Sequence, residues 1–132
     1  MVIQWYGHSC FMLELEDKRK IVFDPYNEKI GYAPIHLQAD LVLISHSHYD
    51  HAHLSAVEGT YTTLRHVGEY KLSGITVKGI HSFHDKEGGR LKGHNIIFVV
   101  DAEGIRICHC GDLGHIIDNE TAANIGSVDY LL

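Results

Sequence analysis

The sequence predicts a sheet-rich α/β protein, and three observations support that class. Apolar and polar residues alternate in short segments through the first quarter of the chain, which is typical of paired strands. The apolar segment 41–44 resembles a short strand that is buried on both faces. The segments after it mix strand and helix patterns. Hairpins followed by strands that interleave with helices indicate a layered α/β structure.

The first elements are expected to be strands. Alternation predicts strands over residues 2–6, 10–16 and 20–24, and Pro25 ends the third because proline cannot donate to a strand ladder. Residues 26–38 are expected to be a loop that leads to the apolar strand.

Helix and loop signals follow the apolar strand. A helix is expected to start at Asp50 or His51 and to end at Gly59. Residues 60–80 are expected to form short strands. The glycine-rich, charged segment 82–93 is expected to be a mobile loop.

The last third of the chain is expected to contain one hairpin, one short helix and one strand. The hairpin joins residues 95–101 to residues 105–110. The helix covers 121–125 and can be capped by the segment Asp118-Asn119-Glu120, and an apolar strand follows over 128–132.

Length, composition and charge limit the classes of protein. A chain of 132 residues, 45% hydrophobic, can bury one core, so a single domain over 1–132 is expected. The net charge is −6, and the longest basic run is residues 18–20, so no nucleic-acid or membrane partner is indicated. No signal peptide or membrane span is visible. The three cysteines, Cys10, Cys108 and Cys110, are expected to be reduced, and a cytoplasmic location is expected.

The stretch SHSHYDH, residues 45–51, carries the strongest chemical signal. His46 and His48 are two apart in an extended segment, so both side chains can reach one ion from the same face. Asp50 and His51 follow at the turn and can reach a second ion. Two such ions about 3.5–4 Å apart can hold a bridging hydroxide and polarise a substrate oxygen.

The sequence resembles the metallo-β-lactamase superfamily, in the branch of predicted metal-dependent hydrolases similar to L-ascorbate-6-phosphate lactonase. The segment 46–51 matches the superfamily signature HxHxDH. Further segments that resemble the motifs of this branch are Gly7-His8-Ser9-Cys10-Phe11, Phe23-Asp24-Pro25, residues 39–45, Ser82-Phe83-His84-Asp85 and residues 110–115. The resemblance covers essentially the whole chain.

The resemblance implies an αββα sandwich, of which this chain would supply the N-terminal half and the start of the second half. It also implies ligands for two metals: His46, His48 and His84 for the first, Asp50 and His51 for the second, and Asp112 bridging both. Asp50 would also hold the attacking water or accept its proton. Imidazole and carboxylate ligands suit a divalent metal, zinc first and manganese or iron as alternatives, at one or two per chain.

Several histidines near these motifs have alternative interpretations. His81 competes with His84 as the ligand after the strand. His8 and His115 could either line the site or support its ligands from behind. Asp24 is expected to orient a ligand histidine rather than to bind metal.

A late histidine ligand is expected from the resemblance but is missing. It would come from a motif resembling Pro-Met-His-Tyr, and the chain ends before such a motif. Three explanations stay open: a truncated product, a second chain that completes the fold, or a short chain with a one-metal or degenerate site. The apolar end 128–132 favours the first two, so a homo-oligomer or a completing chain through the C-terminal strand is expected.

The leading functional hypothesis is a metal-dependent hydrolase that uses a metal-activated hydroxide on a small ester, lactone or phosphate-containing substrate. The alternative is a non-catalytic metal-binding or assembly module that lacks the second-half ligand. A metal-poised sensor that uses Cys108 and Cys110 is a weaker third hypothesis. The negative charge speaks against a nuclease.

Overall fold

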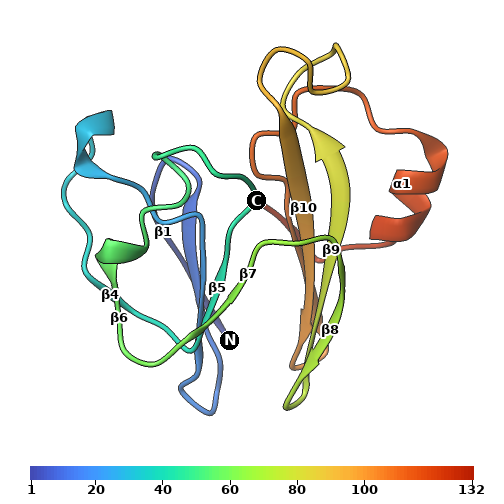
Figure 1. Cartoon of the computed structure of the whole chain (residues 1–132). Coiled ribbons are helices and arrows are strands. Elements are labelled where there is room, and N and C mark those ends of the chain that lie inside the picture. Colours follow the sequence, from blue (N-terminus) through green and yellow to red (C-terminus); the bar gives the residue numbers. More distant parts are fainter. The chain divides into compact units, whose positions relative to one another are not determined.

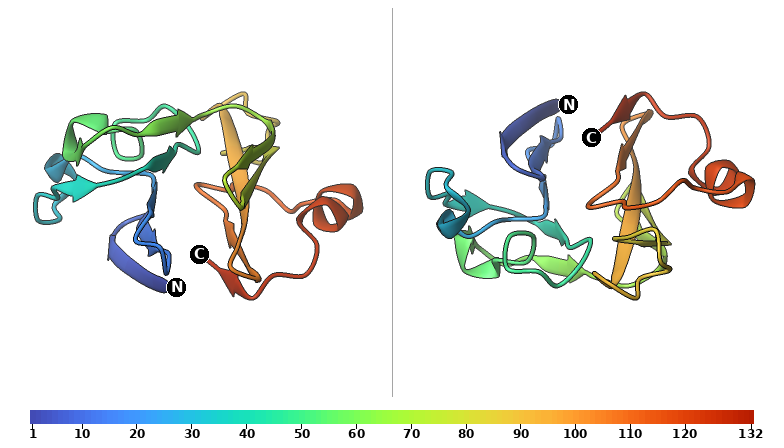
Figure 2. Two further views of the ribbon diagram at one scale, coloured as in Figure 1. Left: turned by 90° about the horizontal axis from the view of Figure 1, so that it is seen from below. Right: turned by 90° about the horizontal axis from the view of Figure 1, so that it is seen from above.

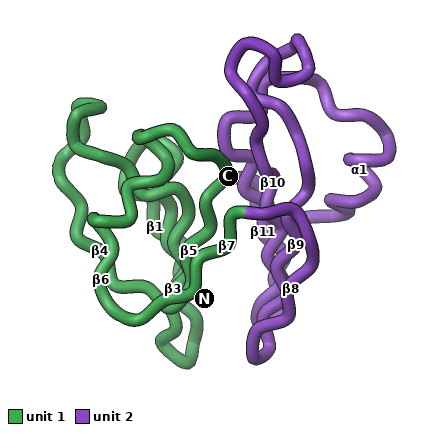
Figure 3. Tube along the Cα trace, in the orientation of Figure 1, with its two compact units in different colours: residues 1–65 green, residues 66–132 purple.

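The structure is a computed structural model that describes residues 1–132 (Figure 1). The chain divides into two compact units, residues 1–65 and residues 66–132, which Figure 3 draws in green and purple. Each unit contains a five-stranded sheet. The single domain expected over residues 1–132 stays a prediction.

The sheet of the first unit combines antiparallel and parallel pairs. Its strands, in spatial order, are β1 (Val2–Gly7), β2 (Cys10–Glu14), β3 (Lys20–Phe23), β5 (Leu41–Leu43) and β7 (Thr62–Leu64). The first three pair antiparallel, as their alternation predicts, whereas β3, β5 and β7 run parallel. The C-terminal ends of β3 and β5 therefore lie at the same edge of the sheet.

Two of the parallel strands, β3 and β5, are buried on both faces. Every residue of β5 is buried, and so are Ile21, Val22 and Phe23 of β3. Burial on both faces is why these strands read as continuous apolar runs instead of alternating ones. Val22 of β3 and Val42 of β5 belong to one buried hydrophobic cluster, together with Met12 and Val57.

The connections of this unit contain two short 3₁₀ helices and a two-stranded sheet. Residues 26–38, expected to be loop, include η1 (Glu28–Ile30) and end in β4 (Leu37–Gln38). Tyr26 opens this segment and is almost fully buried, with its hydroxyl within hydrogen-bond distance of the carbonyls of Tyr6 and Ala33.

The prediction of a helix from Asp50 or His51 to Gly59 is wrong. The chain instead forms a turn, the 3₁₀ helix η2 (Leu54–Ala56) and strand β6 (Val57–Glu58). Strand β6 pairs in parallel with β4, and its valine is buried in the core. A β-branched residue that gains both a ladder partner and burial prefers a strand, so tertiary pairing overrides the weak helix signal.

The second unit has one mixed sheet of five strands. In spatial order they are β12 (Tyr130–Leu131), β11 (Ile105–His109), β10 (His94–Ala102), β9 (Ile75–Phe83) and β8 (Gly68–Leu72). The pairs are antiparallel except that of β11 and β12, which is parallel. The predicted hairpin of β10 and β11 is confirmed.

One helix, α1 (Asn119–Ile125), packs on this second sheet. The two views of Figure 2 show it on one face of the sheet, where Ile125 joins a cluster with Ile80, Ile97 and Cys108. The predicted cap is confirmed, because the Asp118 carboxylate accepts a hydrogen bond from the Thr121 N–H at 2.7 Å. No helix of the structure is long and apolar enough to cross a membrane.

The segment expected to be a mobile loop over 82–93 is organised around one buried carboxylate. Its first residues belong to β9, and beyond them Asp85 accepts hydrogen bonds from four backbone N–H groups, those of Glu87, Gly89, Leu91 and Lys92. Burial raises the pKa of Asp85, but the four bonds outweigh it and hold that pKa below its ordinary value. The carboxylate therefore acts as the loop's internal anchor.

Candidate metal centre

A buried carboxylate connects the ends of β3 and β5. Asp24 follows β3 and accepts a hydrogen bond from the Ser45 N–H at 2.7 Å and another from the Ser45 hydroxyl at 2.5 Å. Its own N–H donates to the Leu43 carbonyl at 3.0 Å. Because Asp24 is fully buried, these bonds take the place of water and fix the start of the histidine segment.

The same carboxylate orients His51. The His51 ring is fully buried, and its Nδ1 lies 2.9 Å from Asp24 Oδ2. A carboxylate can only accept, so Nδ1 carries the proton and Nε2 presents a lone pair. This contact is the one that the predicted orienting role of Asp24 requires, and the role itself stays a prediction; a histidine in this tautomer can offer Nε2 to a metal.

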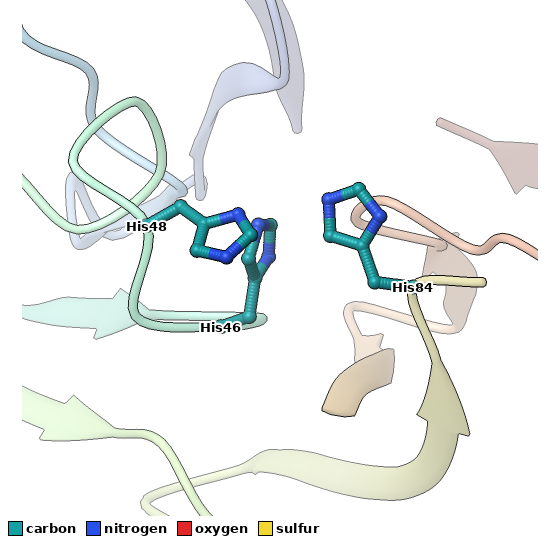
Figure 4. A group of neighbouring side chains, drawn as sticks. All are labelled: His46, His48 and His84. Carbon is teal, nitrogen blue, oxygen red and sulfur yellow. The ribbon is translucent and has the colours of Figure 1, made fainter. Parts of the chain in front are cut away.

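Ser45 orients His46 in the same way. Its hydroxyl donates to Asp24, so it accepts from His46 Nδ1, which lies 2.9 Å away. The Nε2 atom of His46 is then the one with a lone pair. The His46 ring centre lies 4.5 Å from that of His48 and 4.2 Å from that of His51. Figure 4 shows the imidazoles of His46 and His48 close together on the segment after β5. It also labels His84, which follows β9.

Asp50 and His8 complete the cluster of the first unit. His8 Nε2 lies 3.2 Å from Asp50 Oδ2 and 3.0 Å from His51 Nε2. The distance from His51 Nε2 to Asp50 Oδ2 is 3.7 Å. The structure therefore brings His46, His48, Asp50 and His51 together, and it adds His8 to them.

The second unit brings together His84 and Asp112. His84 Nε2 lies 2.8 Å from Asp112 Oδ2. The other candidate, His81, is exposed on β9 and lies against His94, with Nε2 of the first 2.8 Å from Nδ1 of the second. Of the two histidines, His84 is thus the one beside a predicted ligand.

His115 and Gly114 support the His84 segment. His115 Nε2 accepts a hydrogen bond from the Phe83 N–H at 3.1 Å, and its Nδ1 lies 2.9 Å from the Ile116 carbonyl. Both ring nitrogens of His115 therefore have backbone hydrogen-bond partners. Gly114 packs directly on the backbone of His84, where a Cβ atom would lie 2.2 Å from the carbonyl carbon. This position has space only for glycine.

Two supporting residues were missed by the sequence analysis, Ser45 and Asn95. Asn95 is fully buried, its Oδ1 accepts from the Asp112 N–H at 3.0 Å, and its Nδ2 donates to Ser82 and to the Cys110 carbonyl. Ser45 is the first residue of the stretch SHSHYDH. Its place as a polar residue directly after a buried strand was the signal that could have identified it. Asn95 has no such motif, because only the pairing of β10 with β9 brings it to Ser82.

The three cysteines are free thiols. Burial, followed by the charge of Asp24, raises the pKa of Cys10 to about 12. A hydrogen bond between the other two thiols lowers the pKa of Cys110 to about 7 and, with burial, raises that of Cys108. Cys10 and Cys108 are therefore protonated, buried thiols at neutral pH.

The donor set fits a divalent metal. In the first unit, two groups of three side chains each place their ligand atoms within 4.8 Å of one another: His8, Asp50 and His51, and Asp24, His46 and His51. Two imidazoles are held at Nδ1, that of His46 by Ser45 and that of His51 by Asp24. Imidazoles oriented in this way, together with the carboxylate of Asp50, are typical ligands of zinc, manganese or iron.

Comparison with known proteins identifies the family. The model of the family described as beta-lactamase superfamily domain matches residues 2–132. A solved structure from Thermotoga maritima, of a candidate Zn-dependent hydrolase of the metallo-β-lactamase superfamily, has 37% sequence identity and a TM-score of 0.77. It covers 98% of this chain and 58% of its own. The chain belongs to the metallo-β-lactamase superfamily.

Curated relatives agree with this family. Two proteins named UPF0173 metal-dependent hydrolase, from Thermoplasma acidophilum and Thermoplasma volcanium, are 32% and 30% identical over 96% of this chain. The chain spans 66% of the length of each. The structure of a candidate metal-dependent hydrolase from Parabacteroides distasonis, 21% identical with a TM-score of 0.66, has the same fold. The predicted metallo-β-lactamase fold class is confirmed, and residues 1–132 form mainly strands with few helices.

Replacing Asp24 by asparagine should weaken metal binding and lower stability together. The amide would place a donor against Ser45 or against His51 Nδ1–H, so the metal-binding tautomer of His51 would lose its support. We expect zinc affinity, measured by chelator competition, to fall by about 10- to 100-fold. The free energy of unfolding of the metal-free protein should fall by about 1–3 kcal/mol.

Asp40→Asn is the matched control for this change. Asp40 also accepts a backbone hydrogen bond, from Lys20 N–H at 2.8 Å, but it is exposed and contacts none of the histidines. Equal zinc affinity in both variants would contradict the orienting role of Asp24.

Proposed function

We propose that the protein is a metal-dependent hydrolase, or the portion of one that carries its first metal-binding motifs. The single observation that carries this proposal is the convergence of His46, His48, Asp50 and His51 at the edge where β3 and β5 end. A bound divalent metal supplies a Lewis acid and lowers the pKa of a water molecule that it holds. The names of the relatives, metal-dependent hydrolases, support the same reaction class.

The protein's own residues have distinct roles in this proposal. His46 and His48 would hold a divalent metal through ring nitrogens positioned by the segment after β5. Asp50 is partly exposed, so its carboxylate oxygen can accept the proton of an attacking water. His84 and Asp112, which are paired in the second unit, keep the role of metal ligands that the resemblance implies.

Metal removal and reconstitution test the proposal. A chelator should abolish hydrolysis of p-nitrophenyl esters and phosphodiesters, and zinc or manganese should restore it. His48→Ala should lower kcat/KM by at least ~100-fold, because losing a ligand removes several kcal/mol of transition-state stabilisation. His36→Ala, which changes an exposed histidine outside the cluster, is the control and should leave the rate unchanged.

The opposite outcome identifies the alternative function. Tight metal binding with no hydrolysis above that of the free metal ion would favour a non-catalytic metal-binding or assembly module. Activity that survives both chelation and His48→Ala would contradict metal-dependent catalysis altogether.

We further propose an anionic substrate, such as a phosphate ester or a lactone that carries a phosphate. A cavity of about 320 Å³ lies beside the histidines and is lined by Ile44, His46, Ser47, Ala52 and Arg65. Arg65 is the one cationic residue in this lining. A guanidinium is planar and matches phosphate and carboxylate oxygens in pairs, so this wall suits an anion. The resemblance to the ascorbate-6-phosphate lactonase branch supports the same substrate class.

Arg65→Gln should separate charged from neutral substrates. A hydrogen bond to a charged group contributes about 1.5–3 kcal/mol, so kcat/KM for a p-nitrophenyl phosphodiester should fall by about 10- to 100-fold. Hydrolysis of neutral p-nitrophenyl acetate should stay within twofold. Arg90→Gln removes the same charge from an exposed arginine paired with Glu87 and should change neither rate. Equal losses on both substrates would contradict anion recognition.

We also propose that a second chain completes the sheet of the second unit at β12. This two-residue strand is an edge strand, since it pairs only with β11, and Tyr130 and Leu131 are exposed at 51% and 68%. An open apolar edge invites pairing with another strand. Light scattering should give at least twice the 14.8 kDa of one chain, and Leu131→Lys should lower the mass. A monomer at high concentration would contradict this assembly.

A further inference from the structure

We propose that His8 is a metal ligand and holds a divalent cation together with Asp50 and His51. This inference rests on the proposed metal-dependent function and adds a residue that the superfamily signature HxHxDH does not contain. The three ligand atoms are His8 Nε2, Asp50 Oδ2 and His51 Nε2, and all belong to the first unit.

The distances between the three atoms match the distances between neighbouring ligand atoms around one bound metal ion. They are 3.0, 3.2 and 3.7 Å. A tetrahedral site with zinc–nitrogen and zinc–oxygen bonds of usual length has ligand atoms about 3.3 Å apart. The triangle therefore needs no rearrangement of the backbone to surround one ion.

The proton positions around His8 also favour a cation. His51 Nδ1–H donates to Asp24, so the Nε2 atom that faces His8 carries a lone pair. Asp50 presents a carboxylate oxygen, which is also an acceptor. Two acceptor atoms therefore face His8 Nε2, and a divalent cation held among the three atoms would satisfy all of them.

The turn between β1 and β2 holds His8 in this position. The turn is short, since Gly7 pairs with Cys10, and His8 has a left-handed backbone with φ of 49°. Trp5 Nε1–H donates to the His8 carbonyl at 2.9 Å. The Tyr32 ring packs so closely on Gly7 that a Cβ atom there would lie 2.5 Å from it. The imidazole is therefore pre-positioned by contacts that do not involve the metal.

His8→Gly is the suitable variant, because glycine adopts the left-handed conformation without strain and leaves space for an imidazole molecule. The metal-free full chain is titrated with Co²⁺, and the number and affinity of the sites are read from the visible absorption. The wild-type chain should bind one cobalt ion through His8, Asp50 and His51. In His8→Gly the affinity for that ion should fall at least 100-fold, and added imidazole should restore it.

His53→Ala is the matched control, since His53 lies in the same unit near Asn27 and outside the cluster. Its cobalt affinity should equal that of the wild-type chain and should not respond to imidazole. Unchanged cobalt affinity in His8→Gly would overturn the ligand assignment, and so would a loss that imidazole does not restore in a variant with a wild-type circular dichroism spectrum.

The same titration distinguishes this inference from the proposed function. A wild-type chain that binds no cobalt at all would overturn both. A wild-type chain that binds cobalt as tightly as His8→Gly does would overturn only the role of His8 and would leave the hydrolase proposal standing on His46, His48 and His51.

Discussion

The candidate metal centre depends on one buried carboxylate, that of Asp24. Its two oxygens accept from the Ser45 backbone, the Ser45 hydroxyl and His51, and the hydroxyl in turn accepts from His46. A fully buried carboxylate without partners would be strongly unfavourable, so each of these donors stabilises the fold as well as the site. One group thus fixes the end of β3, the end of β5 and the tautomers of two histidines. Because the three donors share one buried carboxylate, a change at any donor affects the others.

The parallel pairing of β3 and β5 makes this arrangement available. Parallel strands end at the same edge of a sheet, so Asp24 and Ser45 meet there although 20 residues separate them in the chain. The second unit uses a related device. Asn95, buried between β9 and β11, holds the backbone of Asp112 and of Cys110, while Asp85 organises the loop after His84. In both units a buried polar side chain next to a strand end supports the residues that carry the chemistry.

The sequence was sufficient for the features that depend on local pattern. Alternation and turn residues predicted the early strands, the hairpin of β10 and β11 and the capped helix α1, and the HxHxDH segment predicted the cluster after β5. It was insufficient where non-local pairing decides the outcome. The segment after His51 has helix signals, yet Val57 gains a strand partner in β4 and a place in the core. Asn95 was missed for the same reason, since nothing within β10 indicates that Ser82 and Asp112 will be its partners.

His8 shows how a residue can be judged differently by sequence and by geometry. In the sequence it lies 42 residues before Asp50, and its motif offers equal support for a lining and a supporting role. In the structure a left-handed turn places its Nε2 between two atoms that can only accept. A non-glycine residue keeps such a backbone only where its surroundings over-determine it, and here Trp5 and Tyr32 do so. Lys18, Ser73 and Glu103 also have a left-handed backbone at turns, so the backbone alone does not set His8 apart. What sets it apart is an Nε2 atom that faces the acceptor atoms of both Asp50 and His51.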